Sequence, residues 1–454
     1  MKRKTFLQIS AMSPFMGLRG LNYPGFKADE ILEPERKIPV IGEYDVIVSG
    51  AGPAGVSAAI EAGRNGAKTL LIEAHGCLGG VWTSGLLTWI LDQANKSGFM
   101  RELEDHLTSR YAVSTDIDTG RVLSFDPEIM KLLLEELCLE AGVEILFHSR
   151  VVAAIKDNYQ RLTHIVTESK SGREAWKGNI FIDTTGDGDL AALSGCGFDL
   201  GREGDSALQP FSLLALISGV TFDEISEFSR WAGDKGSASK KRLFEAIKNG
   251  GLVPSYMSPS IHPIRNDLFK LMVNHQYGFS PLNSREVTKA TLQARKEIND
   301  IVNALKSTGG VWKNLKLIAT AEQIGIREAR RIHGLYTVTI EDLTKGARFD
   351  DAVCRVTFGV DVHSVSKKDE ESQGAYNQSV KSKDYDIPLR SLIAKDVGGL
   401  MMAGRCISGD FIAHSSYRVT GNAVSMGEAA GRTAAKASKL NVLPQEVNFH
   451  SLGL

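Results

Sequence analysis

The segment from Tyr44 to Glu73 constrains the fold of this chain more than any other. It begins with an apolar run, Val46 to Val48, which suits a strand buried on both faces. Glycines follow at the G-x-G-x-x-G spacing, and a helix of small residues leads to a second apolar strand. That strand ends at Glu73, whose carboxylate can accept from a ribose hydroxyl. Together these elements predict a dinucleotide-binding unit.

Each glycine of this motif has a predicted role. Gly50 permits the tight turn, Gly52 lets the backbone approach a pyrophosphate, and Gly55 lets the helix pack closely on the sheet. The N-terminus of the helix offers free N–H groups to phosphates. The alternative is an ordinary glycine-rich turn without a ligand. Other residues predicted to contact the cofactor from this unit and the strands after it are Pro53, Ala54, Ala74, Gly79, Gly80 and Val152.

Composition excludes several other classes of protein. The 454 residues are too many for one compact core, so two domains are expected. Fifty-three basic residues against 54 acidic ones give a net charge of −1, which argues against nucleic acid as the main partner. The five cysteines are scattered without a C-x-x-C pair, so we predict buried free thiols and no metal site.

The N-terminal segment differs from the rest of the chain. Residues 1–20 begin with Lys2-Arg3-Lys4 and continue with a weakly apolar stretch, Ile9 to Leu18, that is too short to span a bilayer. This arrangement resembles a degenerate twin-arginine signal and predicts export to the periplasm, with no transmembrane segment. The alternative is a disordered basic tail on a cytoplasmic protein. Residues 21–42, with three prolines, are expected to form an extended arm.

The pattern along the chain predicts a discontinuous nucleotide domain, residues 43–200 and 386–440, interrupted by an inserted domain at 201–385. Residues 1–42 form the signal-like segment and arm, and 441–454 a C-terminal tail. Periodicity predicts helices at 99–107, 127–139, 285–305 and 422–440. Short β-rich runs predict a parallel strand at 143–147, an antiparallel meander through 151–182, and strands at 211–220, 336–340, 353–362 and 400–403.

A second motif is the run from Phe181 to Asp189, in which an apolar strand enters a turn rich in glycine and aspartate. Its predicted cofactor contacts are Thr185, Gly186 and Asp187. Glycine there lets the backbone come close to a ligand, and an aspartate can accept from a hydroxyl. The alternative is a capped turn between strand and helix.

A third motif runs from Gly399 to Gly431. A strand ends at Gly404, a polar loop follows, and a glycine-punctuated helix begins near Asn422, with its N-terminus free to face an electron-rich ring. The cofactor contacts predicted from this motif are Gly404, Arg405, Ser408, Gly421, Asn422 and Ala423.

These three motifs, in this order, resemble those of the flavoproteins with two dinucleotide-binding domains. The runs 185–189, 209–210, 324–331 and 403–431 resemble more closely the bacterial FAD-dependent oxidoreductase family, related to the fumarate reductase and succinate dehydrogenase flavoproteins. The resemblance implies an α/β fold: a Rossmann-like FAD-binding domain of the glutathione-reductase type, with a β-meander and an inserted α+β substrate domain. It also implies non-covalent FAD. The first motif would hold the ADP half, residues 404–408 would pass the ribityl chain and the pyrophosphate, and the helix at Asn422 would face the pyrimidine edge of the ring.

His414 and Arg418 match a His-x-x-x-Arg pair that lies over the flavin in the fumarate reductase relatives and binds a substrate carboxylate. Arginine supplies a permanently charged, bidentate clamp, and histidine can shuttle a proton. The alternative is a structural salt bridge with a solvent-facing histidine. Position 405 is arginine where many flavoproteins have an acid, and the proton-donating arginine of the relatives is not found. Fumarate reduction itself is therefore not expected.

Two further groups of polar residues stand out. Arg327 and Arg331 are predicted to share one face of a helical turn, where they either anchor anionic groups of the substrate or cofactor or pair with acids between domains. Asp361 and His363 are predicted to share one face of a strand, as site residues or as a buried structural pair.

The sequence thus predicts an FAD-dependent dehydrogenase or oxidase that transfers a hydride between flavin N5 and a small polar substrate, with a carboxylate on that substrate as a hypothesis. A second nucleotide motif is absent from the sequence, so the partner for electrons is an external acceptor: oxygen, a quinone or a carrier protein. Two alternatives are an NAD-dependent dehydrogenase with a single Rossmann unit and a non-catalytic flavoprotein with structural FAD.

Overall fold

A computed structural model describes residues 31–115, 122–230, 237–373, 376–377 and 380–453. The predicted export signal lies outside these residues. Residues 31–39 carry neither helix nor strand, and the first strand, β1 (Val40–Ser49), begins within the predicted arm. Across the described ranges, we find no helix that combines the length and the apolar character needed to cross a membrane.

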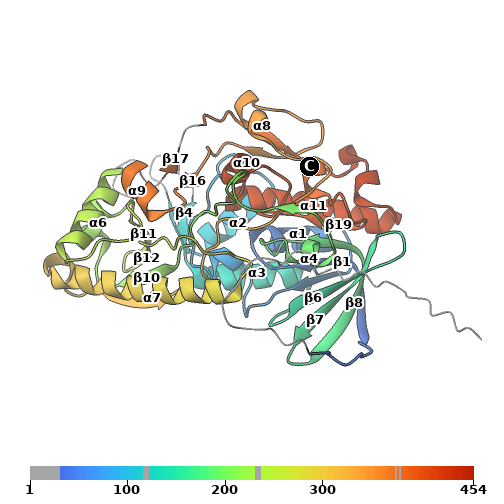
Figure 1. The fold of residues 1–454 in the computed structure, drawn as a ribbon, viewed down its shortest axis with the longest axis horizontal. Coiled ribbons are helices and arrows are strands. Elements are labelled where there is room, and N and C mark those ends of the chain that lie inside the picture. The colour runs from blue at the N-terminus through green and yellow to red at the C-terminus, as the bar shows by residue number, and fades with distance from the viewer. Residues whose placement is uncertain (1–30, 116–121, 231–236, 374–375, 378–379, 454) are drawn as a thin grey trace, which may run out of the picture.

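A parallel sheet forms the centre of the molecule (Figure 1). Its strand order is β5 (Glu144–Leu146), β2 (Thr69–Ile72), β1, β8 (Gly172–Asp183) and β19 (Leu400–Met402), all parallel. Helices α1 (Pro53–Arg64) and α3 (Pro127–Glu140) connect its first strands. Because the carboxyl ends of parallel strands meet at one edge of a sheet, the turns after β1, β2, β8 and β19 converge there.

An antiparallel meander extends the same sheet, as predicted. Strands β6 (Arg150–Lys156) and β7 (Leu162–Ser169) pair with each other, and β7 pairs with the first half of β8. The second half of β8 pairs with β19 on that same edge. One long strand therefore belongs to the meander at its start and to the parallel sheet at its end.

Helix α11 (Thr420–Leu440) packs directly against α1, and small residues make this contact close. A side chain at Gly427 would clash with Ala54 O, and one at Gly431 would clash with Ala58 O. The hydroxyl of Ser57 donates to Val424 O at 2.8 Å. The small-residue composition of both helices thus serves their packing and brings the start of α11 beside the first glycine motif.

A second, antiparallel sheet has the order β11 (Ser260–Arg265), β12 (Leu268–Met272), β10 (Leu214–Ser218) and β13 (Lys316–Thr320). Figure 1 shows α7 (Ser284–Ser307) lying along this sheet. The side chain of Asn283 caps α7 by accepting from Arg285 N and Glu286 N. The helix buries a face that includes Ile298 and Ile301.

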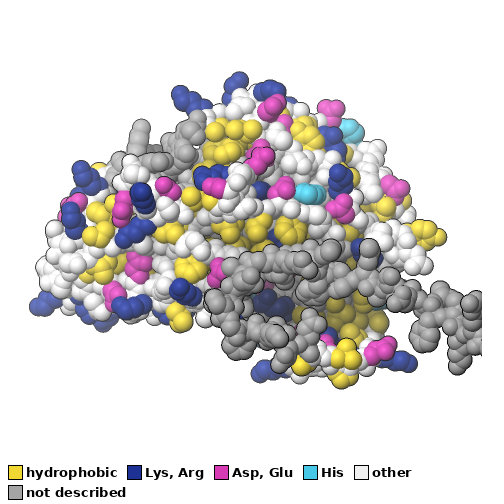
Figure 2. Space-filling view, viewed as in Figure 1, with side chains coloured by type: hydrophobic (Ala, Val, Ile, Leu, Met, Phe, Trp, Pro, Cys, Tyr) yellow, Lys and Arg dark blue, Asp and Glu magenta, His cyan; other side chains and the backbone are white. Residues whose placement is uncertain are grey.

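The buried apolar side chains form two clusters. The first core joins residues 44–196 to residues 332–452, and the second core joins Leu86 to residues 211–324. The domain boundaries drawn from the sequence stay predictions. The face shown in Figure 2 carries basic and acidic side chains intermixed, in keeping with the net charge of −1.

Four predictions about local structure are wrong. Residues 324–331 form no helix, because their polar side chains bond to distant segments, and only β14 (Arg331–Ile332) is regular there. The segment 336–340 is not a strand, since Thr339 caps α8 (Ile340–Lys345) through Asp342. The strand expected over 353–362 is divided into β15 (Ala352–Val356) and β16 (Val362–His363). The polar loop after Gly404 contains a helix, α10 (Phe411–Tyr417).

Of the other helices, α2 confirms the periodicity predicted at 99–107, α6 is a further helix of 13 residues without a predicted range, and the rest are short. Their bounds are α2 (Phe99–Ser109), α4 (Asp189–Leu193), α5 (Phe222–Ile225), α6 (Ser237–Asn249), α9 (Lys367–Gln373), η1 (Gly80–Trp82), η2 (Ser226–Phe228), η3 (Gly310–Trp312), η4 (Leu389–Leu392), η5 (Pro444–Glu446) and η6 (Phe449–Ser451). The other strands are β3 (Val113–Thr115), β4 (Val122–Phe125), β9 (Phe198–Asp199), β17 (Tyr376–Asn377) and β18 (Tyr385–Pro388).

Candidate functional site

A pocket lies at the carboxyl ends of β1, β2, β8 and β19, where an open α/β sheet binds its ligands. It contains many of the residues predicted to bind the cofactor, and also Arg418. The predicted residues that line it are Gly50, Gly52, Pro53, Ala54, Glu73, Gly80, Thr185, Gly186, Gly404, Arg405, Arg418 and Ala423. The fold therefore brings residues from all three sequence motifs to one place.

The three glycines of the first motif differ in what surrounds them. Gly50 has a φ of +94°, and a side chain there would meet Thr184 O at 2.7 Å. A side chain at Gly55 would clash with Gly50 O. Gly52 has an ordinary φ of −70°, and a Cβ added to it meets nothing within 4 Å. Since neither conformation nor packing requires glycine at 52, the space beside it fits a ligand that approaches the backbone.

Glu73 closes the edge of the pocket beside the start of α1. Its side chain is buried, with Oε2 accepting from Ala51 N at 2.7 Å and Oε1 from His75 N at 2.9 Å. These bonds fix the carboxylate at the end of β2. Its remaining acceptor positions suit the hydroxyls of a ribose. The α1 N-terminus next to it suits phosphate.

The second and third motifs meet through an ion pair between Asp187 and Arg405. Burial raises the pKa of Asp187, and the Arg405 guanidinium acts against that rise. Arg405 Nε has no partner among the described residues. Nearby, burial raises the pKa of Asp183 to about 6, although this carboxylate accepts from Ala191 N and from Thr185.

Arg418 reaches the pocket from the C-terminal end of α10. Its Nη2 donates to Asp361 O at 2.8 Å, to Asp361 Oδ2 at 3.4 Å and to Gln209 Oε1 at 3.2 Å. Its Nε has no partner among the described residues. Burial lowers the pKa of Arg418 to about 10, so the guanidinium still carries its charge at neutral pH. Asp361 also contacts His363: the distance from His363 Nε2 to Asp361 Oδ2 is 3.3 Å.

His414 lies one helical turn before Arg418 and is completely buried. Neither ring nitrogen has a hydrogen-bond partner of good geometry in the described part of the chain, although the backbone of Arg405 is close enough to raise the pKa of the ring slightly. Burial, together with the charge of Arg418, holds the pKa of His414 well below its usual range, so the ring is neutral. A buried ring with two unpaired nitrogens is costly and suits a partner that the protein itself does not provide.

Arg327 and Arg331 lie apart and point to different surroundings. Arg327 donates to Pro210 O and Ser212 Oγ and lies 3.2 Å from His275 Nε2. Arg331 donates to Glu328 Oε1 at 2.6 Å and, through its other nitrogens, to the carbonyls of residues 201 and 409. Each nitrogen of Arg331 is bonded within the protein, and a catalytic role for it stays a prediction.

Several predicted residues do not line the pocket. Gly421 packs against the backbone of residues 91 and 92, and the hydroxyl of Ser408 lies 3.0 Å from that of Thr337. Asn422 is buried, with Nδ2 unpartnered among the described residues. The rest are Gly55, Ala74, Gly79, Val152, Asp187, His414, Arg327 and Arg331.

Other lining residues are absent from the sequence prediction: Val81, Gly85, Thr184, Gln323, Ile324, Gly325, Ile326, Ala403 and Thr420. The run 323–326 is distant in sequence from the first motif. It is held beside it because Gln323 N donates to Ser84 O at 3.2 Å. Gly325 is the sequence signal that could identify this run, which lies just before the helical turn predicted for Arg327 to Arg331.

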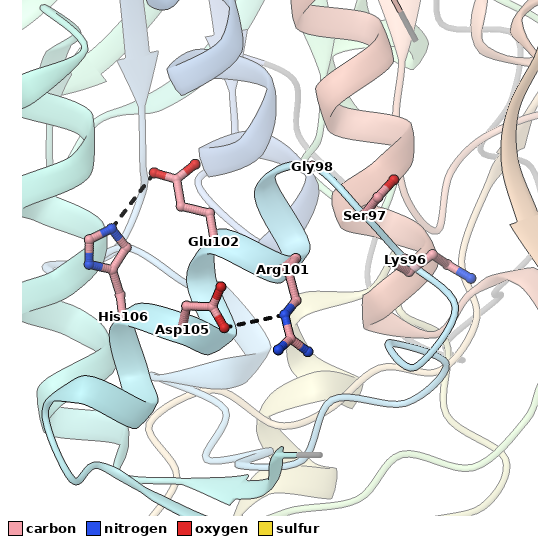
Figure 3. Close-up of a pocket in the computed structure, with 7 residues that line it drawn as sticks. All are labelled: Lys96, Ser97, Gly98, Arg101, Glu102, Asp105 and His106. Atoms are coloured by element: carbon pink, nitrogen blue, oxygen red, sulfur yellow. Dashed lines mark ion pairs between the residues drawn. The ribbon is translucent and has the colours of Figure 1, made fainter. Parts of the chain in front are cut away.

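A separate open depression lies at the start of α2, lined by Lys96, Ser97, Gly98, Arg101, Glu102, Asp105 and His106 (Figure 3). Arg101 pairs with Asp105 at 3.2 Å, and His106 lies 3.8 Å from Glu102. These pairs are partly exposed and satisfy each other, so the depression has no feature that points to a ligand.

Residues 45–453 match the family described as FAD dependent oxidoreductase. No curated protein matches the sequence. Three solved structures resemble the chain at low identity. A geranylgeranyl bacteriochlorophyll reductase-like protein from Thermoplasma acidophilum is 13% identical, with a TM-score of 0.47 over 88% of this chain and 80% of that one. The flavin-dependent brominase Bmp2 is 14% identical, with a TM-score of 0.47 over 87% and 80%.

The third structure, p-nitrophenol 4-monooxygenase from Pseudomonas putida, is 11% identical, with a TM-score of 0.45 over 90% of this chain and 82% of that one. The family match spans nearly the whole sequence. The residues present fit its cofactor: neither packing nor conformation requires the glycine at position 52, which lines the pocket, and the nearby Nε atoms of Arg405 and Arg418 have no partner among the described residues. The chain belongs to the FAD dependent oxidoreductase family, and its cofactor is FAD.

Proposed function

We propose that the protein is an FAD-dependent dehydrogenase or oxidase that transfers a hydride between flavin N5 and a carbon of a small polar substrate bearing a carboxylate. The proposal includes a non-covalent cofactor and a fold of the glutathione-reductase type. FAD supplies the hydride chemistry when bound. One observation carries the proposal: Arg418 is a buried cation that lines the pocket and keeps an unpartnered nitrogen among the described residues.

The environment of Arg418 supports a carboxylate as its partner. A buried charge is expensive unless it is paired and fully hydrogen-bonded. Among the described residues, Arg418 forms an ion pair with Asp361, which also contacts His363, and the charge of Glu328 acts on it without a direct contact. A carboxylate that enters the pocket would accept from the remaining N–H groups in the bidentate geometry that a guanidinium provides.

His414 is the second residue of the proposed site. Its neutral ring can donate one hydrogen bond and accept another, according to its tautomer. It lies one helical turn from Arg418; His414 is completely buried, and the Arg418 side chain is 11% exposed. We propose that His414 orients a polar group of the substrate or holds a proton, while Arg418 fixes the carboxylate.

The electrons need an external acceptor, for which oxygen, a quinone or a carrier protein are the candidates. The alternative function is that of a non-catalytic flavoprotein, in which the unpartnered nitrogens serve the cofactor alone. A single-Rossmann NAD-dependent dehydrogenase, the other alternative, does not agree with the family match.

The test begins with the visible spectrum of the purified full chain, followed anaerobically while hydroxy acids, amino acids and their neutral analogues are added. We expect flavin bands that bleach with an acid but not with its amide. The Arg418→Met variant should keep its flavin bands and lose bleaching by about 100-fold or more in rate, the cost of one charge-assisted pair. Arg265→Met, at an exposed position, is the control.

Two outcomes would contradict the proposal. Bleaching of Arg418→Met at the wild-type rate would remove Arg418 from the site. Flavin bands that respond to dithionite but to no compound of the panel would favour the non-catalytic alternative.

A further inference from the structure

The second sheet turns one face toward the first core, and that face carries a buried lysine. On β12, Phe269 and Leu271 belong to the second core, and Lys270 lies between them. Successive side chains of a strand point to opposite faces, so Lys270 projects away from α7. Its cross-strand neighbours are Leu216 on β10 and His262 on β11.

Trp89 lies against Lys270 at the junction of the two cores. It belongs to the segment between η1 and α2, in which Leu86 packs in the second core and Ile90 in the first. Lys270 Nζ lies 5.4 Å from the centre of the Trp89 ring, and the Arg230 guanidinium lies 4.3 Å from it. The same segment begins with Val81 and Gly85, which line the FAD pocket.

Two polar groups in this cluster lack partners. Lys270 is 1% exposed, and the structure gives its ammonium group no acceptor from any described residue. His262 is also 1% exposed, with its ring 4.9 Å from that of Trp89, and its Nδ1 has no partner among the same residues. Its Nε2 contacts Ser260 Oγ at 3.2 Å.

Buried lysines are normally paired with an acid or exposed at their tip. Here the neighbours of Lys270 are cationic or aromatic. Burial and the charge of Arg230 lower the pKa of Lys270 to about 7. The face of Trp89 attracts these cations, but it accepts no conventional hydrogen bond from them. An incoming anion would supply acceptor atoms that the described residues do not give to Lys270 and to His262 Nδ1.

We propose that Lys270 and His262, held against Trp89, form an oxyanion subsite at the junction of the two cores, for a carboxylate or phosphate group on an apolar body. Leu216 and Leu268, each 8% exposed, provide apolar surroundings for that body. The proposal goes beyond the hydride transfer proposed above, because it adds an anion contact on the second sheet, separate from Arg418.

The test is calorimetric titration of the full-length, flavin-loaded protein with sodium benzoate and, separately, with sodium sulfate. We expect benzoate to bind and Lys270→Met to weaken it about tenfold or more, the loss of one hydrogen bond to a charged group. Lys316→Met, an exposed position on β13 at the edge of the same sheet, should bind as the wild type does. His262→Phe keeps a ring against Trp89 and should weaken binding less than Lys270→Met.

Each outcome is decisive. Binding of benzoate alone supports an organic anion as the ligand, and equal binding of sulfate supports a free inorganic oxyanion. Failure of both anions to bind, or equal affinity in Lys270→Met that melts as the wild type does, overturns the subsite. Binding that is lost in Arg418→Met but retained in Lys270→Met also overturns it while leaving the proposed function standing. Binding lost only in Lys270→Met supports the subsite whether or not the proposed function holds.

Discussion

The parallel and antiparallel sheets present different kinds of polar group. Turns of the parallel sheet line the pocket largely with backbone, at glycines 50, 52, 80, 186 and 404. The antiparallel sheet presents side chains instead, among them Lys270 and His262. Backbone N–H groups and helix N-termini suit a cofactor fragment common to many enzymes. Charged side chains vary from protein to protein and can select a substrate.

The two regions also differ in how their charges are balanced. In the first core, Arg331 and Glu328 pair at 2.6 Å in a completely internal network. Elsewhere, Arg418 Nε and His262 Nδ1 have no partner among the described residues, and Lys270, beside His262, is 1% exposed. Balanced buried charges are typical of structural positions, and unbalanced ones are candidates for ligand contacts.

The largest expected effect is a loss of stability in the parallel-sheet region. In Gly55→Val the new side chain would clash with Gly50 O and approach Thr184 Oγ1 at 2.7 Å. Because Gly50 O belongs to the backbone turn itself, relief requires a shift of α1, and we expect a loss of more than about 3 kcal/mol of stability. Thermal unfolding followed by circular dichroism measures this, and a wild-type melting temperature would contradict it.

Arg331→Met tests the buried ion pair between Arg331 and Glu328. Removing one partner of a buried ion pair typically costs about 3–5 kcal/mol, because the other charge is left unpaired. Glu328 is 0% exposed, and burial already raises its pKa. Urea unfolding should show the loss, with Arg101→Met as the exposed control. Normal stability with abolished turnover would instead support the catalytic role predicted from the sequence.

Gly52→Val distinguishes an effect on FAD binding from an effect on stability within a single motif. A Cβ added at Gly52 meets no atom of the described residues within 4 Å, so we expect nearly normal stability. It would occupy the space beside the backbone, and FAD affinity should fall roughly 100-fold, the loss of about two charge-assisted hydrogen bonds. Fluorescence titration of the apoprotein with FAD measures the change. Unaltered affinity would show that the pyrophosphate does not approach Gly52.

The smallest expected effect concerns an exposed pair. Arg64 donates to Glu102 at 2.6 and 2.7 Å and lowers the pKa of Glu102. Both side chains are about one-third exposed, so Glu102→Gln should cost less than about 1 kcal/mol at pH 7. A lowered pKa stabilises the fold above the unfolded pKa, and this contribution disappears as the pH falls through the folded value. Variant and wild type should therefore converge as the pH falls through the lowered pKa of Glu102, as measured by urea unfolding.

Local patterns in the sequence were sufficient for the nucleotide-binding elements. The glycine spacing before α1 and the apolar runs of β1 and β2 lie within thirty residues, so turn chemistry and strand burial agree there. The long helix α7 was also predictable, since its apolar face repeats over many turns. The segment 324–331 was not, because its arginines bond to residues more than a hundred positions away in the chain.

The sequence by itself thus determined the parallel sheet, the first glycine motif and the FAD family, since each rests on short-range periodicity or fixed spacing. Only the tertiary structure decided which cations are paired with acids inside the protein. The sequence alone does not distinguish the surroundings of Arg331, Arg418 and Lys270. Those surroundings differ because burial and partners from distant segments differ. Charge balance depends on neighbours in space, and a linear pattern does not specify those neighbours.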